Sequence, residues 1–515
     1  MPATKTLVRL GAQLCLLCTV VQVQAQNIGT DEARRAQERE AELQRRLLTQ
    51  PDARLDGGAS TASSGPLIAD ERPCFALGRI TLTGVPGTDA AHFGWLRETL
   101  DGPDGRDTPV GKCLGARGVA QLIDRAQQAL VARGFVTSRV FAPAQDLSTG
   151  ELQLQVLPGR IRAIRFAPPV SERATAVNAV PARPGDILNL RDIEQALENF
   201  QRVPTVQADI QIVPADGPQD APGLSDLVIR WEQKQLLRVN LGVDDSGGHG
   251  TGKYQGQLTV SYDHGLTLND LFYLTLQRDL GGGDGHGGYG TRGATVHYSL
   301  PLGYWQLGFT ASRSRYHQTV RDPLEDLVYS GQSASQELRL ARLVHRDATS
   351  KTTLSLKAFA RQSSNFIRDV EIEDQHRRVG GWEAALGHRA YLGRATLDLS
   401  LTHRRGTGAF GALPAAEEAL GEGTSRLRLS TFDASLQTPF DWAGRAWRYS
   451  GSLRVQQHHT PLTPQDRFAI GGRYSVRGFD GETSLTGDSG WLVRNELSTA
   501  LGDGGTDILP IEQCK

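Results

Sequence analysis

The stretch YQGQLTVSYD, residues 254–263, decides the fold class. Its side chains alternate strictly, with Leu258, Val260 and Tyr262 on an apolar face. The polar face carries Gln255, Gln257, Thr259 and Ser261. This two-residue period is typical of a β-strand, because successive side chains point to opposite faces of the sheet. Such a strand either buries its apolar face in a soluble sandwich or turns that face to lipid around a wet interior.

Segments of the same kind recur along the chain from residue 236 to residue 501, and with this stretch they make twelve. The others are 236–244, 270–279, 291–300, 304–314, 335–345, 352–363, 380–392, 394–404, 426–438, 446–457 and 490–501. Their length of about 10 residues favours a bilayer crossing, because ordinary strands average about 5–6 residues. Tight connections at 301–303 and 392–394 alternate with long ones, as in bacterial outer-membrane barrels.

The composition excludes two classes of protein. The 515 residues include 56 Lys+Arg and 57 Asp+Glu, a net charge of −1, so no global basic field can hold nucleic acid. The mean hydropathy is −0.35, and no second long apolar run exists that could form another spanning helix. A membrane barrel stays compatible with these numbers, because its strands are apolar only at every second position.

The N-terminus predicts an exported protein. Residues 1–25 resemble a secretory signal peptide, with a basic start, an apolar run over 10–21 and a small-residue exit that ends at Ala25. In the oxidising periplasm, Cys74 and Cys113 are candidates for one disulfide within a small domain. Two buried free thiols are the alternative.

A charged helix is predicted within residues 26–50. It is rich in helix formers from residue 30 to residue 49, but its apolar stripe is only Leu43, Leu47 and Leu48. Such a helix cannot join an ordinary core, so we expect it in water or in a polar environment. Residues 51–73 follow, and the run GGASTASSGP predicts a flexible linker.

Two α/β modules are predicted at 74–159 and 160–233. Each combines a first strand, a helix with apolar residues at helical spacing, and two further strands. The helices are expected at 115–133 and 190–202. Neither module presents a nucleophile or a metal cluster, so the repeat favours interaction domains.

The stretch FAIGGRYSVRGFDGETSLTGDSGWLVRNE, residues 468–496, identifies a family. Its central motif is Val476, Arg477, Gly478 and Phe479. The supporting positions are Gly471, Gly472, Gly487, Asp488, Arg494 and Glu496. With RGFVTSR at 133–139 and DDSG at 244–247, this set resembles the two-partner secretion transporters, the haemolysin secretion/activation family of outer-membrane proteins.

The resemblance implies a mainly β fold. It predicts a transmembrane antiparallel β-barrel at 234–515, two POTRA domains in the modules, and a plug formed by the 26–50 helix. Residues 464–489 become a long loop that folds into the lumen, where Arg477 at its tip pairs with a luminal carboxylate. Relatives of this kind have sixteen strands with that carboxylate in the thirteenth, so the chain resembles a family member truncated after its twelfth strand.

The resemblance also implies function and location. We expect an outer-membrane protein of a Gram-negative bacterium with periplasmic POTRA domains, which exports a large haemolysin/haemagglutinin-like passenger without nucleotide hydrolysis. The resemblance leaves open whether export also activates the passenger. The implied partners are that passenger, outer-membrane lipid and the barrel assembly machinery. No cofactor, metal, nucleic acid or enzymatic activity is expected. We expect the passenger to dock beside the second module's helix, at Leu190, Ile193, Leu197 and Phe200.

Three other functions compete with export. Inward-facing charges also suit a passive porin, although a porin has no use for two periplasmic modules. A truncated barrel could be non-functional, because an unpaired sheet edge in lipid is unfavourable. The string Gly487-Asp488-Ser489-Gly490 resembles a serine-protease nucleophile motif, with His92 as its histidine. Those two residues lie 489 − 92 = 397 positions apart in different modules, which argues against a protease.

Overall fold

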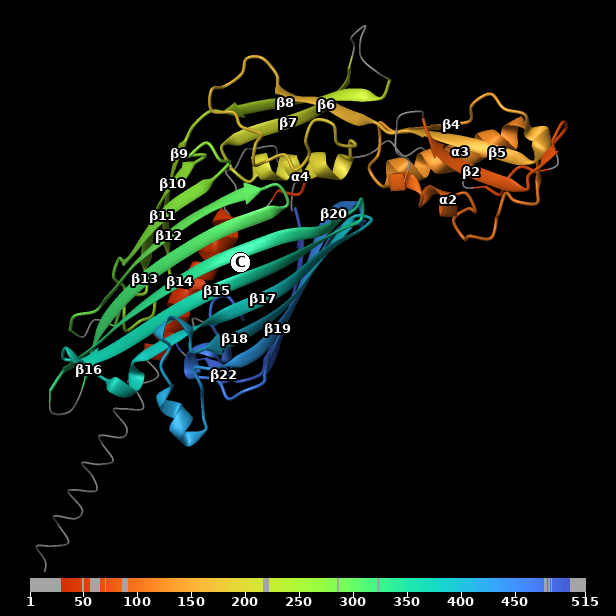
Figure 1. Cartoon of the computed structure of the whole chain (residues 1–515). Helices are drawn as coiled ribbons and strands as arrows, with labels where there is room; N and C mark the ends of the chain where they lie inside the picture. Colours follow the sequence, from red (N-terminus) through yellow and green to blue (C-terminus); the bar gives the residue numbers. More distant parts are fainter. Residues whose placement is uncertain are drawn as a thin grey trace, which may run out of the picture.

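The computed structural model describes residues 29–48, 51–55, 65–69, 71–85, 91–215, 222–284, 287–321, 325–476, 479, 482 and 484–500. The predicted signal peptide, Arg477 and Gly478 lie outside the described residues. Figure 1 shows two small α/β modules in a row and a large curved sheet beneath the second of them.

The first module packs a helix on a three-stranded sheet. Its elements are β1 (Phe75–Ala76), β2 (Arg79–Gly84), α2 (Leu96–Thr99), β3 (Cys113–Leu114), α3 (Ala116–Ala132), β4 (Arg139–Phe141) and β5 (Glu151–Leu157). The strands β2, β5 and β4 form the sheet in that order, and β1 pairs with β3. Leu122 and Leu130 of α3 are fully buried with Leu152 and Leu154 of β5. A disulfide joins Cys74 to Cys113.

The second module repeats this plan with β6 (Arg160–Phe166), α4 (Leu190–Gln201), β7 (Val206–Pro214) and β8 (Leu224–Gln233). The sheet order is β6-β8-β7. Helix α4 begins after Asn189, whose side chain caps it by accepting a hydrogen bond from the Arg191 backbone N–H. Its apolar face packs against Ile229 and Trp231 of β8 in a core of its own.

Twelve antiparallel strands form the continuous path of the large sheet. They are β9 (Leu237–Asp244), β10 (Gln255–Asp263), β11 (Leu271–Asp279), β12 (Gly290–Leu302), β13 (Trp305–Val320), β14 (Leu327–Arg346), β15 (Ser350–Ile367), β17 (Arg377–Leu392), β18 (Ala395–Thr407), β19 (Arg428–Trp442), β20 (Arg445–His458) and β23 (Gly490–Thr499). The short β16 (Val370–Glu371) pairs with β15. All twelve predicted segments are therefore confirmed as strands.

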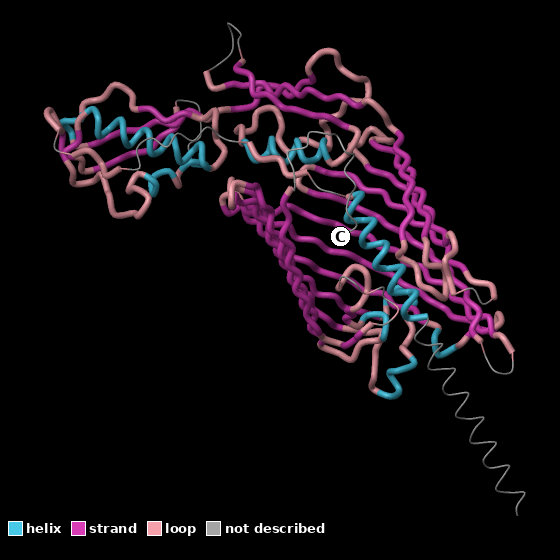
Figure 2. The backbone as a smooth tube through the Cα atoms, turned by 180° about the vertical axis from the view of Figure 1, so that it is seen from behind, coloured by secondary structure: helices cyan, strands magenta, loops and turns pink. Residues whose placement is uncertain are grey.

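The sheet curves around a central space but is open (Figure 2). Within the described residues, β9 and β23 are its two edges and do not pair with each other. Several middle strands are longer than the predicted length. β14 has 20 residues and β15 has 18, so both extend well past the apolar band of an outer-membrane barrel.

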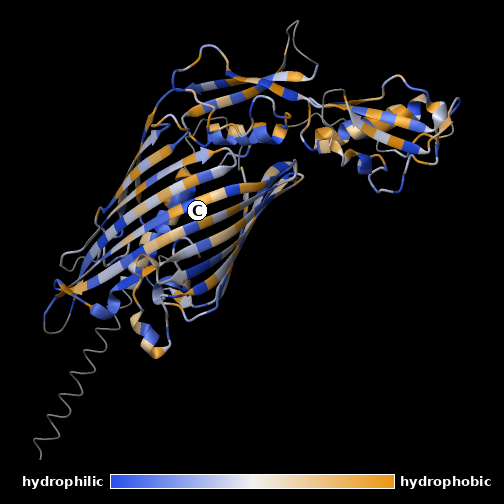
Figure 3. Cartoon of the chain, in the orientation of Figure 1, coloured by the Kyte–Doolittle hydropathy of each residue, from blue (hydrophilic) through white to orange (hydrophobic). Residues whose placement is uncertain are grey.

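Burial in this sheet is the reverse of burial in a soluble protein. On β10, Thr259 is 1% exposed and Ser261 is fully buried on the inner side. On the outer side, Leu241 of β9 is 81% exposed and Leu401 of β18 is 52% exposed. Figure 3 shows the alternating bands of hydrophobic and hydrophilic residues along the strands. A soluble sandwich would bury the apolar face, so that alternative is wrong.

A helix over residues 29–47 lies on the concave side of the sheet, between its two edges (Figures 1 and 2). In the described part of the chain, no helix has the length and apolar character needed to cross a membrane.

Candidate functional site

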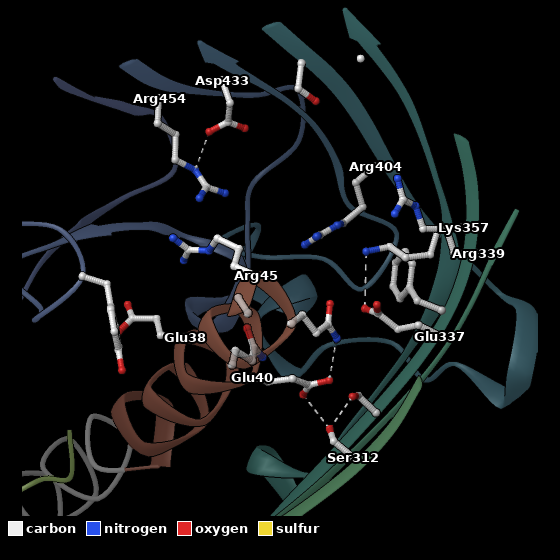
Figure 4. A pocket seen from close by; sticks show the side chains of 18 of the residues that line it. Glu38, Glu40, Arg45, Ser312, Glu337, Arg339, Lys357, Arg404, Asp433 and Arg454 are labelled. Carbon is white, nitrogen blue, oxygen red and sulfur yellow. Dashed lines mark hydrogen bonds and ion pairs between the residues drawn. The ribbon is translucent and has the colours of Figure 1, made fainter. Parts of the chain in front are cut away.

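Two segments lie in the lumen of the sheet: the helix at 29–47 and the described part of the segment 464–476. A cavity of about 1060 Å³ remains between them and the wall. Figure 4 shows Glu38, Glu40 and Arg45 of the helix beside charged side chains of the strands. The lumen is therefore polar. This explains how a charged helix with only a thin apolar stripe finds a stable place.

Polar contacts hold the helix in the lumen, among them an ion pair of 3.3 Å between Arg35 and Glu482. Ser312 Oγ of β13 donates to Glu40 Oε2 at 2.8 Å, and Thr251 Oγ1 donates to Glu32 Oε1 at 2.9 Å. Arg39 Nη1 donates to the Ser246 carbonyl at 3.2 Å. These contacts position the helix without a large apolar interface.

The wall beside the helix carries a network of ion pairs. Lys357 of β15 lies 3.1 Å from Glu383 of β17 and 3.5 Å from Glu337 of β14. Arg404 of β18 lies 2.8 Å from the same Glu383 carboxylate. Because these charges neutralise one another across four neighbouring strands, they hold the luminal face in register.

The described residues 465–469 and 474–475, from the predicted loop, line the luminal cavity. The loop's strands β21 (Phe468–Ile470) and β22 (Leu485–Gly487) form a hairpin. Asp466, 8% exposed, accepts a hydrogen bond from Arg361 Nη2 of β15 at 2.9 Å. At the neck of the loop, Arg467 Nε donates to Asp488 Oδ1 at 3.0 Å. The sequence analysis missed Asp466 as an anchor, although its position at the start of the loop beside Arg467 was a weak signal.

The supporting motif residues form turns and bonds in the same loop. The backbone N–H groups of Gly471 and Gly472 each donate to Ser475 Oγ at 3.0 Å. Arg494 of β23 donates to the Tyr474 carbonyl at 3.1 Å and to Glu496 at 3.3 Å. Val476 and Phe479 are joined by a backbone hydrogen bond of 3.4 Å. Arg473, which the motif did not include, pairs with Asp245 of the DDSG turn.

The predicted passenger-docking residues on α4 are wrong. Leu190, Ile193, Leu197 and Phe200 are 4%, 2%, 5% and 0% exposed. They form the face that packs on the module's own sheet. Apolar residues at helical spacing were interpreted as a binding surface, but here they build the core, and a partner cannot reach them.

The opposite face of α4 lies against the near rim of the large sheet, the rim formed by the short turns. Asn199 Nδ2 donates to the Gly303 carbonyl at 2.8 Å. Arg202, which follows the helix, donates to Ser299 Oγ at 2.6 Å. Asp192 accepts a hydrogen bond from the Tyr304 hydroxyl. The second module is thus docked on the sheet through polar contacts.

The start of the predicted linker is fixed at this rim. Arg346 donates to Glu194 at 2.9 Å and to Glu198 at 3.0 Å, and its side chain is 4% exposed. Lys351 donates to Glu198 at 3.0 Å and to Asp52 at 2.9 Å. We call these five residues the rim clamp.

The clamp also holds the backbone of residues 51–55. The Leu55 N–H donates to Glu194 at 2.8 Å, and the Ala53 N–H donates to Glu198 at 3.1 Å. Farther along, the Leu67 N–H donates to Asp107 of the first module at 2.7 Å. Glycine and serine content predicted a flexible linker, but the described residues at its two ends are bound to folded surfaces.

The protease arrangement does not form. His92 lies in the first module, where its ring packs edge-on against Phe93 and Phe135. Ser489 instead contacts His458, with Oγ 2.6 Å from Nδ1, and the same Oγ accepts the His458 backbone N–H. Within the described ranges, no carboxylate bonds to His458, and no group of metal-ligating side chains is found.

A plugged polar lumen, a lipid-facing exterior and two docked α/β modules define an outer-membrane transporter with POTRA domains. The family description "Haemolysin secretion/activation protein ShlB/FhaC/HecB" matches residues 223–510. A POTRA domain matches 160–214, and a ShlB-type POTRA domain matches 106–159. The chain belongs to this family of two-partner secretion transporters.

Curated relatives and solved structures agree with this assignment. The outer membrane transporter CdiB-2 of Burkholderia pseudomallei is 33% identical, over 93% of this chain and 81% of the relative. The hemolysin transporter protein ShlB of Serratia marcescens is 23% identical, over 91% and 77%. The structure of CdiB from Acinetobacter baumannii is 32% identical with a TM-score of 0.79, and covers 92% of this chain and 84% of its own. The protein is an outer-membrane transporter that exports a passenger, with its POTRA domains in the periplasm.

Proposed function

We propose that the chain exports a haemolysin/haemagglutinin-like passenger in extended form through the lumen, and that the helix at 29–47 leaves the lumen first. The polar attachment of this helix carries the proposal. Its contacts through Glu32, Arg39 and Glu40 are hydrogen bonds to charged groups, each with a net contribution of about 1.5–3 kcal/mol, and water can replace them one at a time. The helix can therefore be displaced while the strand ladder stays intact. Relatives that are haemolysin transporters support this class of passenger.

The proposal contains no enzymatic step, cofactor or nucleotide. Binding of the passenger to the modules and its folding outside the cell supply the direction of transport. The buried apolar face of α4 cannot bind the passenger, so an edge of a module sheet is the better site. β7 is an edge strand of the second module within the described chain, and an extended peptide can add to it as a further strand.

Membrane lipid and the barrel assembly machinery complete the proposed partners. The exposed apolar residues along the outer face support contact with lipid. A passive porin is the second candidate, favoured by the charged luminal wall. The helix and the folded loop in the lumen count against it, because both obstruct the free path of a small solute.

A reversible cross-link between the helix and the wall tests the export proposal. Glu40→Cys and Ser312→Cys replace a contacting pair, and a short bis-methanethiosulfonate reagent bridges the two thiols. We expect export of a tagged passenger to stop after cross-linking and to return after mild reduction. Export is measured as passenger in the medium.

The matched control joins two strands and leaves the helix free. Ser312→Cys with Ser335→Cys replaces a cross-strand pair whose Oγ atoms are 2.8 Å apart. This variant should export normally when cross-linked. If the helix–wall cross-link leaves export unchanged, the helix does not need to leave and the proposal is wrong. Constant conductance without passenger export would favour the porin.

The loop-lock role of Arg477 also stays a proposal. The ion pairs Arg361–Asp466 and Arg467–Asp488 support this role, because both connect the segment through charged groups. We expect Arg477→Ala to reduce passenger export strongly, and Arg477→Lys to restore it only in part because lysine lacks the bidentate fork. Equal export by Arg477→Ala and the unaltered chain would rule out the lock.

A further inference from the structure

A row of cationic and aromatic side chains crosses the outer face of three strands near the far rim, opposite the POTRA domains. Trp382 of β17 is paired in register with Arg405 of β18, and Arg405 with Arg428 of β19. These positions have the same parity as Leu401 and Phe432, which are 52% and 36% exposed on the lipid-facing side. The row therefore points outward rather than into the lumen.

The side chains on this outer face change from basic to polar to apolar with distance from the far rim. Nearest the far rim is the row with Arg405 and Arg428. Next come His403 and Ser430, which are hydrogen-bonded at 3.1 Å, with His459 Nε2 2.9 Å from Ser430 Oγ. After them the face is apolar from Leu401 and Phe432 onward. The basic row thus lies at the border of the apolar band, where lipid headgroups meet the protein.

The same side chains line a hollow of about 630 Å³. Trp382, Arg405, Arg426 and Arg428 form its side-chain walls, and the backbone of 406–408 closes it. Among the described residues, no carboxylate lines this hollow. The acid next to it, Glu418, is occupied by hydrogen bonds from Thr424 and Ser425.

The charges of these arginines are not neutralised within the chain. In the described structure, Arg405, Arg426 and Arg428 form no ion pair. The preceding residue, Arg404, points to the lumen and pairs with both Glu383 and Asp466. Arg404 is thus neutralised on the luminal face, whereas Arg405, Arg426 and Arg428 keep their positive charge on the outer face.

We propose that this hollow binds the phosphate of a phosphorylated lipid headgroup in the outer leaflet of the membrane. Guanidinium groups bind phosphate oxygens bidentately, and the hollow supplies three of them without a competing carboxylate. Trp382 offers an amphipathic ring of the kind found at membrane–water borders. The acyl chains of the same lipid would continue over Leu401 and Phe432.

Retention of defined lipids by the purified full chain in detergent tests this proposal, with native mass spectrometry as the readout. The probes are bisphosphorylated lipid A, its dephosphorylated form and inorganic phosphate. The double variant Arg405→Gln/Arg428→Gln removes two charges from the hollow. Arg445→Gln/Arg448→Gln removes two exposed charges at the near rim and is the matched control.

We expect the chain to retain bisphosphorylated lipid A in preference to the dephosphorylated form. The hollow variant should bind it about tenfold to thirtyfold more weakly, because each basic residue at an anionic surface adds about a factor of five. The control should match the unaltered chain. Arg405→Lys/Arg428→Lys should keep most of the binding, and near-UV circular dichroism checks that each variant is folded.

Three results would overturn the inference. One is equal lipid A retention by the hollow variant and the control. Another is equal retention of phosphorylated and dephosphorylated lipid. The third is displacement of the lipid by inorganic phosphate at equal concentration, which would make the hollow a site for soluble anions.

Discussion

The second POTRA domain and the large sheet use the same alternating strands and bury opposite faces. In the domain, Val206 and Ile210 of β7 are 5% and 7% exposed in the core, and the polar Gln207, Asp209 and Gln211 of the same strand face outward. In the large sheet, Leu401 is 52% exposed, while Ser261 is fully buried inside. The local pattern is identical, so the surrounding solvent decides which face becomes the interior.

The two regions are consequently stabilised by different forces. The domains gain free energy from apolar burial, which is not directional. The luminal face gains it from hydrogen bonds and ion pairs such as Lys357–Glu383 and Arg361–Asp466. Directional contacts of this kind fix the positions of the helix and the loop, and they can be exchanged one at a time.

The largest difference in stability between the two regions is expected when a charge is placed on the apolar face of each. Phe200→Asp buries a carboxylate in the domain core, and we expect the domain to lose more than about 4 kcal/mol of stability. Leu401→Asp places the same charge on the lipid-facing side and should disturb the folded sheet much less in detergent. Amide hydrogen exchange of the full chain measures both. Equal loss of protection in the two variants would contradict the inverted burial.

The second largest effect is expected when Arg346, the central cation of the rim clamp, is removed. Arg346→Ala leaves Glu194 and Glu198 without their partner, and breaking a buried pair of this kind costs about 3–5 kcal/mol. Hydrogen exchange should rise in residues 51–55 and in α4, and conductance in planar bilayers should rise as the helix is released. Arg342→Ala, on the same strand with an exposed side chain over Trp305, is the control and should change little. Unchanged exchange in residues 51–55 would show that the clamp does not hold them.

The third largest effect is expected when the disulfide of the first POTRA domain is removed. Cys74→Ser/Cys113→Ser opens a link between residues 39 positions apart, and we expect this domain to lose about 2–4 kcal/mol. Thermal unfolding with and without reductant measures the loss, and Cys514→Ser serves as the control for the reductant. The large sheet should be insensitive, so a shift of its own transition would contradict the separation of the two regions.

The smallest effect is a pH dependence in the same domain. Burial alone would raise the pKa of Asp107, but hydrogen bonds from Lys112 and Arg125 hold it at about 2, below its usual 3.8. A lowered pKa stabilises the folded state above about pH 4, and this stabilisation is lost as the pH falls towards 2. Asp107→Asn should be less stable than the unaltered chain at pH 7. Thermal unfolding curves of the two proteins should converge near pH 2, and a constant difference across this range would refute the assignment.

The strands could be predicted from the sequence because their signal is local. A two-residue period such as that of Gln255 to Tyr262 needs no knowledge of the neighbours. The extra length of β14 was missed because the stretch SGQSAS at 330–335, near its start, has only small or polar residues on both faces and shows no apolar alternation. Beyond the apolar band, a strand no longer alternates apolar and polar side chains, so its sequence does not predict it.

The contacts of the site could be predicted only in part. The family motif located the luminal loop, but the anchor between Asp466 and Arg361 joins residues 105 positions apart. Arg346 and Glu194 of the rim clamp are 152 positions apart. Such pairs depend on how distant segments and domains pack together, which residue composition and hydrophobic period do not encode. The apolar stripe of α4 was visible, but its assignment to a partner was wrong because its own sheet covers it.

The fixed residues 51–55 give the luminal helix the properties of a tethered ligand. A helix anchored at its C-terminal side cannot diffuse away after it leaves the lumen. A short tether keeps a binding group at an effective concentration of about millimolar, however dilute the protein is in the membrane. On the proposed export route, individual contacts such as Glu40–Ser312 would then suffice for a rapid return of the helix. The passage would reseal after each transport event without a tight seal.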